Sequence, residues 1–229
     1  MIDEPYEPVS AVDHEAPGQY LVRTVIEANG GSVEFIPVPW KRCIAGNRTG
    51  EYDGILGIVD DPELFSFISY PRSQGVVNSQ ERLAPLEFVI MRRKGIDASW
   101  DGQRFEHLTG PVLYGRGIVA IRLKLAALNT PGSEEAKTLA QVARMVFAGR
   151  YELGALRRNE AQALVQLPEF GGQLEILPTT FEEVSVYFGV ARHLYQTNAL
   201  FFDAVWESIA RQRSHSDWPE QARRLLAVP

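Results

Sequence analysis

The sequence is poor in cysteine and holds its few histidines far apart. Cys43 is the only cysteine among 229 residues, which excludes a disulfide or a cysteine-based zinc site within one chain. The four histidines are His14, His107, His193 and His215, and no two of them have a metal-binding spacing. The chain also lacks a P-loop, a G-x-S-x-G motif and a full dinucleotide fingerprint. We therefore expect no metal and no cofactor.

Basic charge and long apolar runs are also scarce. The chain carries 23 Lys and Arg against 29 Asp and Glu, a net charge of -6 with a pI near 5.3. A field of this sign does not favour nucleic acid or anionic membranes. The longest apolar runs, such as residues 184–190, are strand-sized and well short of the roughly 18 residues that cross a bilayer. We expect neither a nucleic-acid partner nor a membrane span.

The hydrophobic pattern alternates between periods of 2 and 3.6, which is typical of an α/β fold. Helices are predicted at residues 19–29, 40–48, 118–128, 134–148, near 157–167, 197–212 and 217–227, with Ser133 as the N-cap of the helix at 134–148. Strands are predicted at residues 32–38, 52–59, 85–93, 110–114, 151–156, 173–177 and 183–192. This order indicates one lobe interrupted by another. We predict a first lobe of residues 1–92 and 188–229 and an inserted second lobe of residues 93–187, with the strands at 85–93 and 183–192 as the crossings.

Several short motifs occur in an order that resembles a known family. They are PYEP at 5–8, VPWKR at 38–42, GEYDGILG at 50–57, LTGPVLYGRG at 108–117, FAGRYE at 147–152 and VYFGVAR at 186–192. Together they resemble the family 3 periplasmic solute-binding proteins, which have the two-lobed periplasmic-binding-protein type 2 fold. The first motif already begins at residue 5, so we expect most of the family's first strand and its leader peptide to be missing from this sequence. Another segment would have to fill the place of that strand.

The resemblance implies ligand contacts in the first lobe. Tyr6 and Trp40 match the two positions whose aromatic rings flank the ligand, and Gly57 belongs to the same group of motifs. The alternative for Trp40 is a ring that only covers the core beside two prolines. The family's carboxylate-binding arginine is absent from the turn at 59–64, so Arg72, Ser73 and Gln74 become the polar candidates, unless they form an ordinary exposed loop.

Further candidates lie in the second lobe. Arg157 occupies the position of the family's amine-binding acid, which favours an anionic ligand over a standard amino acid. Tyr114, Arg116 and Gly117 open a predicted helix whose backbone N–H groups could hold an anion. A solvated helix start and a plain strand-to-helix turn are the alternatives.

Three functions follow from the resemblance. The first is a periplasmic protein that captures a small polar or anionic solute between its lobes and delivers it to the membrane subunits of an ABC-type importer. If the start of the chain is genuine, the location would instead be cytoplasmic. The second is a sensor or degenerate ligand-binding domain without a transport role. The third is a dehydratase-like enzyme, which would need a carboxylate with a raised pKa, and Glu152 and Glu63 are its candidates. A non-catalytic binding protein is the preferred interpretation.

Overall fold

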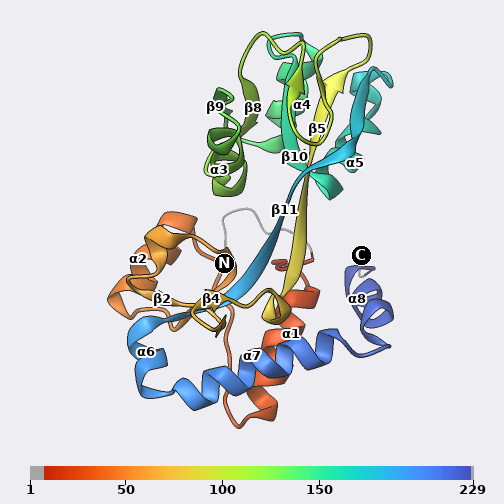
Figure 1. The fold of residues 1–229 in the computed structure, drawn as a ribbon. Coiled ribbons are helices and arrows are strands. Elements are labelled where there is room, and N and C mark those ends of the chain that lie inside the picture. Colours follow the sequence, from red (N-terminus) through yellow and green to blue (C-terminus); the bar gives the residue numbers. More distant parts are fainter. Residues whose placement is uncertain (1–7, 228–229) are drawn as a thin grey trace. The chain divides into compact units, whose positions relative to one another are not determined.

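The computed structural model describes residues 8–227, which form two compact units (Figure 1). Of the described residues, 8–85 and 185–227 belong to unit 1, and unit 2 is Leu86–Val184. Strands β5 (Ala84–Arg93) and β11 (Leu174–Ala191) carry the chain from one unit to the other. The chain therefore passes out of unit 1 and back along strands, which have fewer accessible conformations than a loop.

Unit 1 is a short antiparallel strand group covered by helices. Its helices are α1 (Pro17–Ala28), α2 (Trp40–Thr49), α6 (Arg192–Thr197), α7 (Ala199–Arg213) and α8 (Trp218–Leu226), with 3-10 turns η1 (Pro62–Leu64) and η2 (Ser79–Glu81). Strands β1 (Gly54–Val59) and β2 (Ile68–Ser69) both pair antiparallel with β11, and β3 (Arg72–Ser73) pairs with β4 (Val76–Val77) in a separate hairpin. In Figure 1, α7 runs across α1 at the base of this unit.

The local sequence explains where the helices of unit 1 begin and end. Gln19 accepts backbone hydrogen bonds from Ala11 at 2.9 Å and Ala16 at 3.0 Å, which ties the preceding loop to the first turn of α1. Helix α2 starts directly after Pro39 and ends at Gly50, whose φ of 83° is the left-handed conformation of a helix C-cap. These signals are local, so the sequence alone predicts both helices well.

One hydrophobic cluster of unit 1 lies between α2, β1 and the returning part of β11. It is formed by buried side chains of Val38, Cys43, Ile55, Ile58, Ile68, Tyr70 and Tyr187. Cys43 is thus a small buried apolar side chain, as expected for a lone cysteine. On the other side, α1 and α7 meet through a hydrogen bond of 3.3 Å between Thr24 Oγ1 and Gln212 Oε1.

Unit 2 is a mixed sheet with helices. Its strand order is β11-β5-β10-β8-β9, where β8 is Val112–Gly115, β9 is Gly132–Ala136 and β10 is Leu153–Arg157. Strand β8 is parallel to both β10 and β9, and β5 is antiparallel to β10. The helices are α3 (Val119–Ala127), α4 (Leu139–Phe147) and α5 (Arg158–Val165), and η3 (Pro168–Phe170) and the hairpin β6 (Ser99–Trp100) and β7 (Phe105–Glu106) complete the unit.

Helix α4 packs closely on the sheet of unit 2. Val142, Ala143 and Val146 are fully buried on its inner face. A Cβ atom at Gly154 of β10 would lie 2.8 Å from Val142 and 3.0 Å from Val146, closer than packed carbons can approach. The glycine therefore sets the distance between helix and sheet.

The structure corrects three sequence predictions. The predicted helix at 134–148 is two elements, because residues 132–136 pair with β8 and the helix begins only at Leu139. Its N-cap is Thr138, which accepts from the Gln141 backbone at 3.2 Å, so the choice of Ser133 was wrong. Pairing with a neighbouring strand has overridden the helix preference of Glu134 and Glu135.

The two other corrections concern strands. The predicted strands at 173–177 and 183–192 form one continuous strand, β11. Residues 32–38 form no strand, although their burial alternates and fits one. Pro37 has no N–H to donate, and no strand of the described chain pairs with this segment.

Candidate functional site

Three strand ends of unit 2 meet at one edge of its sheet. Strands β10, β8 and β9 are parallel, with Ala155 opposite Tyr114 and Gly115 opposite Ala136. Their carboxyl ends therefore lie together, and α5, α3 and α4 start directly beyond them. The carboxyl ends of parallel strands are the usual place for ligands in open α/β sheets, and helix N-termini carry partial positive charge.

Basic side chains gather at this edge. Arg116 and Lys137 follow β8 and β9 and are exposed, while Arg157 is the last residue of β10. The Arg116 backbone donates to the Ala136 carbonyl at 3.0 Å, which joins the ends of β8 and β9. Gly117 then turns the chain into α3 with a φ of 82°, in a place where a Cβ would meet no atom within 4 Å. The sheet edge thus brings Arg116, Gly117 and Arg157 into neighbouring strand ends.

The positive charge of Arg157 is partly balanced by a carboxylate of the same unit. Its guanidinium donates to Glu160 Oε1 at 2.7 Å, and only 14% of the side chain is exposed. Glu160 lies in the first turn of α5, where its charge also favours the helix N-terminus. The side chain is therefore held in place at the start of α5, as a rigid ligand contact requires.

Tyr114 is placed differently from its neighbours. It is 4% exposed, and its hydroxyl donates to Glu134 Oε1 at 3.0 Å, so the ring lies inside unit 2. Burial, followed by the bond to Glu134, raises the pKa of Tyr114 to about 12. The hydroxyl is neutral at physiological pH and already has an acceptor. The hydrogen bond from Tyr114 on β8 to Glu134 on β9 therefore links these two strands.

The candidates of unit 1 lie on two different elements. Trp40 is the first residue of α2 and packs, half buried, against the core cluster around Val38 and Tyr187. Gly57 is buried at a β-bulge between Leu56 and Ile58, with a φ of 82°. This conformation is left-handed and favours glycine. Tyr6 lies outside the described residues.

The three polar candidates of unit 1 form one exposed hairpin. Arg72 and Ser73 pair with Val77 and Val76, and the two turn residues Gln74 and Gly75 have φ values of 52° and 85°. Positive φ at both turn positions is what a type I′ turn requires. The Arg72 guanidinium lies 4.3 Å from the Phe65 ring centroid and donates to the Gly75 carbonyl at 2.7 Å. Arg72 is therefore held by contacts that sequence reasoning did not foresee.

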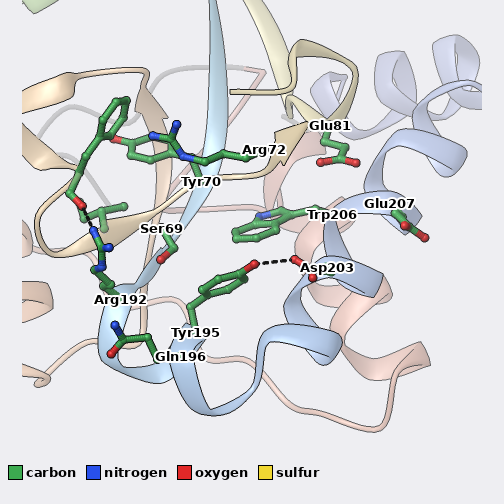
Figure 2. A pocket seen from close by; sticks show the side chains of 12 residues that line it. Ser69, Tyr70, Arg72, Glu81, Arg192, Tyr195, Gln196, Asp203, Trp206 and Glu207 are labelled. Carbon is green, nitrogen blue, oxygen red and sulfur yellow. Dashed lines mark hydrogen bonds between the residues drawn. The ribbon is translucent and has the colours of Figure 1, made fainter. Parts of the chain in front are cut away.

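Sequence reasoning also missed a cavity of about 520 Å³ in unit 1 (Figure 2). Its wall comes from β2 and the chain on both sides of it, from η2, and from α6 and α7. The lining residues are Phe65, Ile68, Ser69, Tyr70, Arg72, Glu81, Arg192, Tyr195, Gln196, Asp203, Trp206 and Glu207. Of these, only Arg72 was a candidate. The sequence did contain one signal for this cavity. Asp203, Trp206 and Glu207 are three and four residues apart within a predicted helix, and residues at that spacing share one face of a helix.

Glu152 is a candidate general acid for the enzyme interpretation, which requires a raised pKa, but its surroundings lower its pKa. Its Oε2 accepts from Thr109 N at 2.8 Å, Thr109 Oγ1 at 3.0 Å and Gly110 N at 3.2 Å. These bonds, led by that from the Thr109 backbone, lower its pKa. The other candidate, Glu63, is exposed in η1. Glu152 is therefore an ionised anchor for a loop and lacks the raised pKa of a general acid.

The described residues offer neither a metal centre nor a membrane-spanning helix. Between residues 8 and 227, no three His, Cys, Asp or Glu side chains are grouped so that they could hold a metal ion. Within the same range, no helix has the length and apolar character needed to span a bilayer.

Comparison with known proteins defines the class of fold. No protein-family profile and no curated protein matches the sequence. Among solved structures, the periplasmic VFT2 domain of BvgS from Bordetella pertussis is 20% identical with a TM-score of 0.65, covering 96% of this chain and 89% of that one. A histidine kinase sensor domain with similarity to periplasmic binding proteins is 16% identical with a TM-score of 0.66, at 97% and 92% coverage.

A third match is the GluR0 ligand-binding core in complex with L-glutamate, 14% identical with a TM-score of 0.68 and coverages of 98% and 96%. The chain thus has the periplasmic-binding-protein type 2 fold, as its motifs predicted. At these identities the likeness establishes the fold alone.

Proposed function

We propose that this chain is a ligand-binding domain for a small polar solute that carries negative charge. One observation carries the proposal. The carboxyl edge of β10, β8 and β9 brings three helix N-termini together with Arg116, Lys137 and Arg157. Backbone N–H groups, helix dipoles and guanidinium groups at one edge favour an anionic group such as a carboxylate.

The unit 1 candidates are part of the same proposal. Trp40 offers an aromatic surface from α2, and the exposed hairpin offers Arg72, Ser73 and Gln74. Gly57 shapes the strand that follows α2. Tyr6 and Tyr114 stay predictions, with Tyr114 assigned to positioning β8 against β9 because its hydroxyl is bonded to Glu134.

A thermal-shift screen tests the proposal. The panel consists of small carboxylates, amino acids, polyamines and sugars, each at saturating concentration. A ligand present at 100 times its Kd should stabilise the protein by about 2.7 kcal/mol. We expect a carboxylate or another anionic solute to raise the melting temperature of the chain. If no member of the panel raises it, the proposal is rejected.

Variants of unit 2 then locate the site. Arg116→Met and Arg157→Met should each abolish the ligand-induced shift, because each removes a positive group from the sheet edge. Arg104→Met is the matched control, since Arg104 belongs to the same unit, is 76% exposed and pairs only with nearby Asp101 and Glu106. Trp40→Ala should reduce the shift; because Trp40 packs half buried against the core cluster, the ligand-free melting temperature will also fall, and the shift is measured against the variant's own ligand-free value. A shift that survives both arginine changes would contradict the placement.

We propose two alternative biological roles for this domain. The motifs favour a periplasmic domain that delivers its solute to an ABC-type importer. A sensor role is the second candidate, favoured because a structural neighbour is described as a histidine kinase sensor domain. Deleting the gene separates them. An importer component predicts loss of uptake of the labelled solute, whereas a sensor predicts normal uptake and a lost transcriptional response.

A further inference from the structure

The cavity of unit 1 is built entirely by one unit, so its existence depends on unit 1 alone. We propose that it is a second binding site, for a small zwitterion whose amine and carboxylate are separated by an aliphatic chain. Its volume of about 520 Å³ lies in the range of small-molecule pockets. This proposal shares only Arg72 with the function proposed above, and its test uses residues that the first proposal does not involve.

One side of the cavity is acidic. Figure 2 shows Glu81, Asp203 and Glu207 on the same side of the pocket. None of the described residues forms an ion pair with Glu81 or Asp203, and Glu207 has only a long contact of 3.9 Å with Arg211. Burial, together with the charges of Glu207 and Asp203, raises the pKa of Glu81. A bound cation would relieve this repulsion.

The cation that fits is organic. The described residues hold no group of three metal-ligating side chains, and aromatic rings adjoin the acidic side. Tyr195 donates its hydroxyl to Asp203 Oδ1 at 3.0 Å, and its ring lies 5.4 Å from that of Trp206 at an angle of 34°. Carboxylates beside aromatic rings are the surroundings that an alkylammonium group prefers.

The opposite side of the cavity is basic. In Figure 2, Arg192 lies across the pocket from Asp203 and Glu207, with Tyr195 and Trp206 between them. Arg192 donates one N–H to the Phe65 carbonyl at 2.6 Å, and Arg72 is stacked on the Phe65 ring. A guanidinium has five N–H donors in a planar fork, so a fixed arginine can still bind a carboxylate. Because the acidic and the basic side chains lie on opposite sides of the cavity, they favour a ligand whose amine and carboxylate are far apart.

The test uses three probes with the same carbon chain, titrated into the whole protein by calorimetry. They are 6-aminohexanoate, hexylamine and hexanoate. We expect saturable binding of 6-aminohexanoate and at least about tenfold weaker binding of the other two, because each lacks one charged contact. No saturable binding of 6-aminohexanoate, or equal binding of hexylamine, would overturn the zwitterion assignment.

Variants tie the binding to the cavity. Asp203→Asn and Glu81→Gln should each weaken 6-aminohexanoate about tenfold, and the amide introduced by Asp203→Asn still offers an oxygen to Tyr195. Arg192→Met should weaken 6-aminohexanoate and leave hexylamine unchanged. Glu220→Gln is the control, because it removes the same charge from α8, where Glu220 pairs with Arg224. Circular dichroism melts verify that each variant is folded.

The two proposals can fail separately. Binding of 6-aminohexanoate should survive Trp40→Ala and Arg116→Met, which lie outside the cavity lining. The ligand of the unit 2 edge should in turn keep its thermal shift in Asp203→Asn. If the cavity variants bind 6-aminohexanoate as tightly as the unchanged protein does, the second site is refuted whatever the first site binds.

Discussion

The indole Nε1 of Trp206 donates a hydrogen bond of 2.9 Å to the carbonyl oxygen of Phe188. The bond joins α7 to β11, and Trp206 is only 2% exposed. Trp206 also lines the cavity of unit 1. The same side chain therefore fixes a helix on a strand and forms part of a proposed binding surface.

Trp206→Phe should destabilise unit 1 by about 1–3 kcal/mol, because it leaves the buried Phe188 carbonyl without its donor. Urea unfolding followed by circular dichroism measures the change. Trp218→Phe is the control, since Trp218 is only half buried at the start of α8, and it should cost less than about 0.5 kcal/mol. Equal effects of the two changes would show that the hydrogen bond does not stabilise the unit.

The sequence predicted correctly those elements whose local signals, such as helix ends and apolar spacing, agree with their packing in the fold. Gly50 ends α2 in a left-handed conformation, and the apolar spacing of Val142 and Val146 marks α4. The failures concern long-range pairing. Nothing local shows that residues 132–136 pair with β8, or that residues 32–38 find no strand beside them in the described part of the chain.

The candidate sites follow the same division. The positions of Arg116 and Arg157 at strand ends were predictable because strand ends and helix starts can be read from periodicity, and parallel pairing then brings these ends to one edge; their contact with a ligand stays a prediction. The cavity was not, because its wall joins Arg72 to Tyr195 and Asp203, which are more than 120 residues away in the sequence. The stacking of Arg72 on Phe65 likewise depends on how the chain folds between them.

Glu152→Gln should destabilise unit 2 by about 1 kcal/mol at pH 7, a figure reduced for the solvent exposure of the carboxylate. Glu152 anchors Thr109 and Gly110 through three hydrogen bonds. Because folding lowers the pKa of Glu152, its contribution is complete above the pKa of the unfolded chain, about 4.3, and is lost as the pH falls through the folded value.

Denaturant unfolding at several pH values between 7 and 3 checks this expectation. The difference in unfolding free energy between the unchanged protein and Glu152→Gln should shrink as the pH falls. Glu106→Gln serves as the control, because Glu106 is 42% exposed in the same unit and its side chain pairs, at 3.4 Å, with the exposed Arg104 rather than with backbone N–H groups. A difference that stays constant with pH would exclude the proposed anchoring by the ionised carboxylate.

Gly117→Ala should destabilise the free protein by about 1 kcal/mol through backbone strain alone. The φ of Gly117 is 82°, which costs an L-residue about 1–2 kcal/mol, and no atom lies near the added methyl group. Gly110→Ala is a matched control, because its Cβ also meets open space and its φ is not in the left-handed range. That change should be neutral or stabilising by up to about 1 kcal/mol. Equal melting temperatures for the two variants would contradict the assigned conformation.

Tyr114 should make the stability of unit 2 fall at high pH. Its pKa is about 12 in the folded protein, above the value near 10 of an unfolded tyrosine, because the ring is buried and bonded to Glu134. The folded state then holds the phenolic proton more tightly. The stabilisation is complete below pH 10 and is lost as the pH rises toward 12.

The comparison between the unchanged protein and Tyr114→Phe isolates this residue. Tyr70, Tyr187 and Tyr195 also have raised pKa values, chiefly through burial, but they are present in both proteins and cancel in the difference. The stability advantage of the unchanged protein should therefore decrease between pH 9 and pH 11.5 in denaturant unfolding. Glu134→Gln should lower the pKa of Tyr114 in an absorbance titration at 295 nm, since it removes the neighbouring negative charge. A stability difference that rises with pH would show that the Tyr114 hydroxyl is not held in the protonated form by its surroundings.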